Sequence, residues 1–135
     1  MKRKYKKIKY APAPDLDEKA RKISGLLFPH IKIDNIACLR SYGSKSHSTI
    51  ARCHALGKVM QLGMKTKAFY TIEFISERFD KMTEKEQEKT IIHELMHIPK
   101  SFGGGFRHHD FVCQGNVDLL HQRFERVKNE NKTWF

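Results

Sequence analysis

The chain has 135 residues, of which 39% are hydrophobic, and this suits one compact domain with a single core. No apolar run approaches the about 20 residues of a membrane-spanning helix, and no apolar segment follows the basic N-terminus, so we expect neither a membrane partner nor a secretory signal. Three cysteines without framework spacing predict reduced thiols and a cytoplasmic location, while the oligomeric state stays open.

The formal charge of +11 is unevenly distributed along the chain. Six of the first ten residues are Lys or Arg, so about half of the excess charge lies on one N-terminal arm. We interpret residues 1–14 as a disordered basic arm that ends in an extended Ala-Pro spacer, "APAP". The alternative is that residues 2–9 bind nucleic acid through its phosphates.

The first predicted helix begins directly after this spacer. Asp15 and Glu18 have capping-box spacing, and Pro29 ends the helix. Its apolar residues recur at helical spacing and form one buried face: Leu16, Ala20, Ile23 and Leu27. We place the folded domain at residues 15–128 and a C-terminal tail at residues 129–135.

Strands are expected in the middle of the chain. The segment 33–42, "IDNIACLRSY", reads as a strand between turn residues, and "TIARCH" at 49–54 is an ambiguous second strand. The clearest strand is 67–76, "KAFYTIEFIS", in which apolar positions alternate with mixed ones. We expect this last strand at a sheet edge, where an extended peptide substrate could add alongside residues 67–75.

A central helix is predicted from Glu84 to Ile98. Thr83 and Glu86 form a second capping-box pattern, and Pro99 disfavours helical geometry in the residue before it. The apolar residues of this segment form a broad stripe, which predicts that most of the helix is buried: Ile91, Ile92, Leu95, Met96 and Ile98.

The same helix carries the pattern H-E-x-x-H. His93 and His97 lie four residues apart, so both imidazoles project from one face and can reach one tetrahedral zinc ion at about 2.0–2.1 Å. Glu94 projects about 100° around the helix axis, where its carboxylate can act on a metal-bound water without binding the metal. Burying these polar groups on a mostly apolar helix is costly, which favours zinc over histidines satisfied within the core.

A catalytic zinc site needs three protein ligands and one open position. The third ligand does not follow the metzincin pattern, because that pattern would place it at Gly103. Glu125 lies too far along the chain, which leaves the adjacent His108 and His109. The run of three glycines before this pair can reverse the chain and return it to the metal. A closed structural site that adds Cys113 to His109 is the alternative.

The stretch "TIIHELMHIPKSFGGGFRHHDF" resembles the minigluzincins and the related phage metallopeptidases, small zincins that are distantly similar to SprT-like proteases. Their pattern, H-E-L-x-H-I-P-x-x-F-x-G-x-x-x-x-H, falls on His93, Glu94, His97, Pro99, Phe102, Gly104 and His109. Two earlier blocks, "RSYGSKSHSTIAR" and "FYTIEFISERFDKMTEKE", are also similar, so the resemblance covers residues 15–121.

The resemblance implies an α+β fold, with about three helices on a three-stranded twisted sheet and H-E-x-x-H on the central helix. It also implies a histidine as the third ligand, which selects His109 over His108. His108 stands where the family often has proline, so an exchange of ligand between the two histidines stays open.

Together these features predict a zinc metalloendopeptidase that acts on peptide or protein substrates. His93, His97 and His109 would bind one catalytic zinc ion, and Glu94 would take a proton from its water and pass it to the leaving amine. The tail at residues 129–135 could cover the cleft and keep the enzyme latent. The alternative is a nucleic-acid-associated protein, with structural zinc or as a DNA-linked protease.

Overall fold

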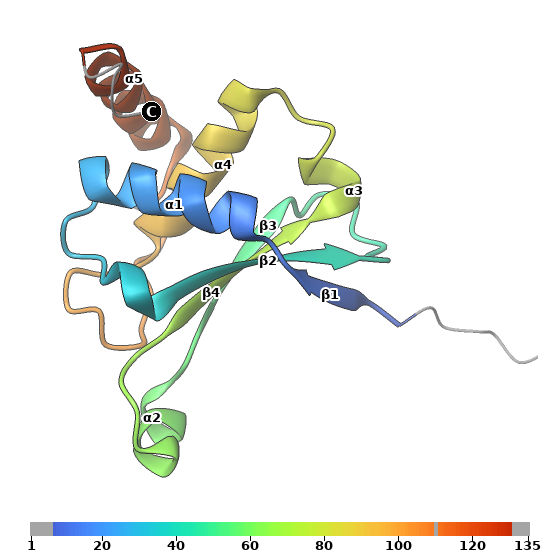
Figure 1. The fold of residues 1–135 in the computed structure, drawn as a ribbon, viewed down its shortest axis with the longest axis vertical. Helices are drawn as coiled ribbons and strands as arrows, with labels where there is room; N and C mark the ends of the chain where they lie inside the picture. The colour runs from blue at the N-terminus through green and yellow to red at the C-terminus, as the bar shows by residue number, and fades with distance from the viewer. Residues whose placement is uncertain (1–6, 110, 131–135) are drawn as a thin grey trace, which may run out of the picture.

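The structure, a computed structural model, describes residues 7–109 and 111–130, which fold as an α+β domain (Figure 1). Within these residues the strands are β1 (Lys9–Pro12), β2 (Ile36–Tyr42), β3 (Ala51–Ala55) and β4 (Tyr70–Ile75). The α-helices are α1 (Pro14–Leu27), α2 (Lys58–Met64), α3 (Ser76–Phe79), α4 (Glu84–Met96) and α5 (Gln114–Glu130), and a short 3-10 turn covers Ile33–Asn35. The described part therefore holds more helices and strands than were predicted.

The strands form one mixed sheet in the order β1-β2-β4-β3. β2 and β4 run parallel and the other two pairs are antiparallel, with Ile72 opposite both Cys38 and Cys53. β4 thus lies inside the sheet, so the prediction that it forms an edge is wrong. Its interior place explains its composition, because Ile72, Phe74 and Ile75 are buried although they point to both faces.

Strand β1 arises from residues that the sequence analysis assigned to the basic arm and its spacer. It pairs antiparallel with β2, with Lys9 opposite Tyr42 and Pro12 opposite Leu39. A proline is tolerated here because β1 is an edge strand and Pro12 is its last residue. Residues 9–12, which were expected in a disordered arm, therefore pair in the sheet, while residues 1–6 of the arm lie outside the described residues.

Helix α1 begins two residues earlier than predicted and without the expected side-chain cap. Pro14 is its first residue and Ala13 its N-cap, so Asp15 lies in the first turn and does not cap the helix. The carboxylate of Asp15 instead accepts two hydrogen bonds from the Arg40 guanidinium on β2, at 2.7 and 2.8 Å. This bidentate pair ties the start of α1 to the sheet.

Helices α1, α4 and α5 pack together with the sheet, and α2 projects from the far end of the molecule (Figure 1). The core contains fully buried side chains from the sheet and from α1, α3 and α4, among them Ile23, Ile72, Phe79, Ile91 and Leu95. Polar pairs join α4 to α5, among them Glu88–His121 at 3.0 Å and Lys89–Asp118 at 2.9 Å. Among the helices of the described residues, none combines the length and apolar character that crossing a bilayer requires.

Candidate metal centre

Helix α4 begins where the sequence predicts and ends two residues earlier, at Met96. Thr83 is the N-cap, and its Oγ1 accepts a hydrogen bond from the N–H of Glu86 at 3.2 Å. His97 is the C-cap residue, with its own N–H bonded back into the last turn. His93 and His97 therefore lie together at the C-terminal end of one helix.

Three histidine side chains converge beside this helix end. One ligand nitrogen from each of His93, His97 and His109 lies within 4.8 Å of the other two. The ring centroids are 5.2 Å apart for His93–His97, 5.1 Å for His97–His109 and 6.1 Å for His93–His109. Nitrogen ligands of one tetrahedral zinc ion lie about 3.3 Å apart, so small ring rotations would bring this cluster to a metal-binding spacing.

The backbone after α4 fixes the orientation of His97. Its Nδ1 lies 2.9 Å from the carbonyl oxygen of Arg107, and the N–H of Arg107 donates to the carbonyl of His97 at 2.7 Å. A proton on Nδ1 that is donated to this carbonyl leaves the lone pair of Nε2 for a metal. The same double contact brings the chain back to α4 two residues before His109.

A turn at residues 102–109, here called the glycine loop, carries the third histidine. Gly104 has a φ of +104°, and a Cβ there would lie 2.6 Å from Nε2 of Gln61 and 2.7 Å from the carbonyl oxygen of Leu56. Only glycine fits that position. Nε2 of Gln61, on α2, also donates to the carbonyl of Gly103 at 3.0 Å. The predicted reversal thus depends on one of the three glycines in particular.

Tyr70 holds the same loop from β4. Its side chain is fully buried, and its hydroxyl donates to the carbonyl of Gly105 at 2.8 Å and accepts from the N–H of Gly104 at 2.9 Å. Its ring packs edge-on against Phe102 and Phe106, with centroids 4.9 and 6.1 Å away. Tyr70 is therefore a positioning residue for the loop that carries His109, a role that the sequence analysis missed.

We expect Tyr70→Phe to weaken zinc binding by about tenfold, because the loop loses both bonds that hold it at β4. The free energy of unfolding should also fall by about 1–3 kcal/mol, since the N–H of Gly104 loses its partner. Competition with a zinc chelator and urea denaturation measure the two effects. Tyr10→Phe, at an exposed position on β1, is the matched control. Unchanged zinc affinity in Tyr70→Phe would contradict this role.

Glu94 follows His93 on α4 and lies beside the histidine cluster, and only 7% of it is exposed. Burial raises the pKa of its carboxyl group to about 7. Burial, and then the charge of Glu94, raise the pKa of Cys53 on β3 to about 12, so this cysteine stays a thiol. A carboxyl group that titrates near neutrality can both accept and release a proton, as a general base and acid must.

In the metal-free protein, the contribution of Glu94 to stability should fall as pH rises towards neutrality. The pKa of Glu94 is about 7 when folded against an ordinary value of 4.5, so between these values the folded state holds a proton that the unfolded chain releases. The contribution of Glu94 to the free energy of unfolding should therefore fall from pH 4.5 to 7, by up to about 3 kcal/mol, and Glu94→Gln should remove this contribution, whereas the lowered pKa of His93 acts in the opposite direction. Urea denaturation in chelator at several pH values measures it. Equal pH profiles for Glu94→Gln and the exposed control Glu86→Gln would contradict it.

The electrostatics of the cluster fit a metal ion. Burial lowers the pKa of His93, and the charges of His97 and His109 lower it further. A neutral imidazole is the form that binds metals. The cluster thus offers three converging nitrogens, one tautomer fixed by a carbonyl and one ring held neutral, which together suit a divalent cation with nitrogen ligands.

Two adjoining cavities of about 560 and 570 Å³ meet at this cluster, and together we call them the cleft. Both are lined by His93, Glu94 and His109, and by Ala51 of β3. β3 is the last strand of the sheet, so among the described residues it pairs with β4 on one side only. The cleft therefore lies between helix α4 and an edge strand.

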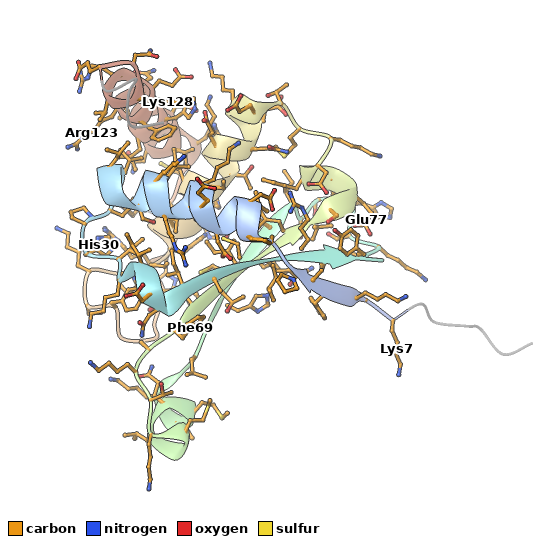
Figure 2. The ribbon with its side chains drawn as sticks, in the orientation of Figure 1. Lys7, His30, Phe69, Glu77, Arg123 and Lys128 are labelled. Carbon is orange, nitrogen blue, oxygen red and sulfur yellow. The ribbon has the colours of Figure 1, made fainter. Side chains whose placement is uncertain are left out.

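The other metal-binding candidates do not join the cluster. His108 is exposed and lines one cavity, but its ring is outside the group of converging nitrogens, and Cys113 is exposed and also outside it. A second group, which the sequence analysis missed, joins Glu88, His121 and Glu125. The ammonium group of Lys128, labelled in Figure 2, lies 3.5 Å from Glu88, so we interpret this group as an ion-pair network between α4 and α5.

An α+β domain that brings three histidines and a buried glutamate together in one cleft defines a small protein with a candidate catalytic metal centre. The family model described as putative phage metallopeptidase matches residues 8–127, and the chain belongs to this family. The match confirms the resemblance seen in the sequence and runs from the start of β1 to near the end of α5. Comparisons with curated proteins and with solved structures find no match.

Proposed function

We propose that this protein is a zinc-dependent metalloendopeptidase. The observation that supports the proposal most directly is the approach of His93, His97 and His109 to within 4.8 Å of one another, next to the buried Glu94. Family membership supports a peptidase that uses a metal ion. Three imidazole ligands with one open position are a ligand set typical of catalytic zinc.

The side chains around the cluster have separate roles in this proposal. A zinc ion held by His93, His97 and His109 would supply a Lewis acid that lowers the pKa of a bound water to about 7 and polarises the scissile carbonyl. Glu94 would take a proton from the attacking water and then donate it to the leaving amine, for which a pKa near neutrality is suited. The carbonyl of Arg107 keeps His97 in one tautomer throughout.

We infer that an extended substrate adds to β3 (Ala51–Ala55) and not to β4. β4 is flanked on both sides by β2 and β3, whereas β3 has a free edge among the described residues. Added strands bind through backbone hydrogen bonds and place alternate side chains in pockets. The cavity of about 560 Å³ beside the cluster has apolar residues in its lining, Ile50, Met82 and Val117, so it suits an apolar substrate side chain.

The family match and the described residues give less support to the other expectations from the sequence. The nucleic-acid alternative gains no support from the family match, which points to a peptidase. Residues 1–6 of the basic arm and residues 131–135 of the tail lie outside the described residues, while α5 continues to Glu130. Latency through that tail and a cytoplasmic location therefore remain proposals.

Removing the metal should abolish hydrolysis reversibly. After dialysis against a strong chelator the protein should cleave no unfolded test protein such as casein, and one equivalent of zinc should restore cleavage. Magnesium at the same concentration should not restore it, because magnesium prefers oxygen ligands. Gel electrophoresis of the digests measures the effect. Cleavage that persists in the chelator would contradict the proposal.

A further inference from the structure

Helix α2 (Lys58–Met64) forms the tip of a projection between β3 and β4, here called the finger (residues 57–67), which extends away from the rest of the domain (Figure 1). Every residue of the finger is exposed except Gln61. Nε2 of Gln61 donates to the carbonyls of Leu56 and Gly103, at 2.7 and 3.0 Å. The finger is thus fixed to the domain through one side of its helix, and its other sides are open.

The open sides of the finger are apolar. Its exposed side chains include Val59 (84% exposed), Leu62 (77%), Met64 (59%) and Met60 (54%). At 100° per residue these four cover about 200° of the helix circumference, with Gln61 on the opposite side. Figure 2 shows the side chains of α2 pointing outward around the tip. Apolar surface gathered in this way on a soluble domain marks a site of interaction.

The charge around this apolar tip is only positive. Lys58, Lys65 and Lys67 lie within or directly beside α2, and all three are exposed. The chain has no Asp or Glu between Asp34 and Glu73, so no acidic residue of the finger offsets these lysines. A partner that fits the finger must therefore accept apolar side chains and carry negative charge next to them.

We propose that the finger docks on an anionic lipid bilayer, with its apolar tip among the lipid head groups and its lysines at the phosphates. The shape of the tip favours a bilayer over a second copy or an acidic protein. A flat protein surface covers one side of a helix, whereas a bilayer closes around a convex tip. A standard protein interface also uses about 20–30 residues a side, more than the finger holds.

This docking goes beyond the proposed peptidase activity and does not depend on it. The expectation of no membrane partner rested on the lack of a spanning segment, and docking on a surface needs none. It would hold the enzyme at a membrane and leave β3 and the histidine cluster to act on substrates there.

Sedimentation of the full-length protein with vesicles tests the proposal. The wild type should bind vesicles of phosphatidylglycerol and phosphatidylcholine, and not vesicles of phosphatidylcholine alone. The double variant Val59→Ser and Leu62→Ser keeps every charge and should bind at least about tenfold more weakly. Leu119→Ser removes another exposed leucine (64% exposed), from α5, and should bind as the wild type does. The triple variant Lys58→Gln, Lys65→Gln and Lys67→Gln should also bind more weakly.

Three results would overturn the proposal. One is that the wild type does not sediment with anionic vesicles. Another is that the double serine variant binds as tightly as the wild type, because binding would then come from the basic N-terminal arm alone. The third is that light scattering shows an oligomer for the wild type and a monomer for the double serine variant, because the finger would then bind a second copy of this chain.

Discussion

Replacing Glu94 with glutamine is expected to lower kcat for peptide hydrolysis by about 10²–10⁴-fold while the metal stays bound. Glutamine has nearly the same shape, so the buried position on α4 can accommodate it, but its amide cannot accept the proton of the attacking water. The three histidines are unchanged by this substitution. Activity should therefore fall without a matching loss of zinc.

The measurement pairs cleavage of an unfolded protein with metal analysis of the same purified sample. Glu86→Gln is the matched control, because Glu86 lies on α4 and lines the same cavity but is exposed. This control should keep both zinc and activity. Full peptidase activity in Glu94→Gln would show that another group accepts the proton, and the mechanism proposed for Glu94 would be wrong.

The second large effect is expected at the glycine loop, where His108 and His109 are neighbours with different surroundings. Structural sites bind zinc with a free energy of about 10–16 kcal/mol. Losing one of three ligands should therefore weaken zinc binding by about 10²–10³-fold. His109→Ala should show this loss, together with loss of hydrolysis. His108→Ala should change zinc affinity by less than about threefold, because its ring is outside the converging group.

Zinc affinity is measured by competition with a chelator, and the folded state of each variant is checked by circular dichroism. The two variants are matched, since each removes one exposed imidazole from the same loop. The opposite ranking, with His108→Ala losing zinc and His109→Ala keeping it, would establish the exchange of ligand that the sequence left open. Equal losses would indicate that the loop, and not one ring, controls binding.

The parts of the fold that local signals determine were predictable from the sequence. Helix α4 is one example, because Thr83 caps it with its own side chain and Pro99 follows its last turn. The placement of β4 was not predictable, since its neighbours β2 and β3 come from separate segments and an alternating pattern does not reveal how many partners a strand has. β1 was hidden because its residues belong to the basic arm and its spacer and include Pro12.

The candidate site likewise has one part that the sequence predicts and one part that it does not. His93, Glu94 and His97 share one short motif, so their proximity follows from helical geometry alone. The contacts that hold the glycine loop join residues far apart in the sequence, 35 positions for Tyr70 with Gly105 and 42 for Gln61 with Gly103. No spacing rule links such residues. The need for glycine at position 104 likewise appears only once Gln61 and Leu56 are in place.

Anomalous diffraction at the zinc absorption edge, from crystals of the protein purified without chelator, tests the central claim most directly. The account predicts one zinc peak bonded to nitrogens of His93, His97 and His109, with Nε2 as the donor of His97 and with Glu94 beside the ion but not bonded to it. A zinc peak held by His108 or Cys113, or no peak at the end of α4, would contradict it.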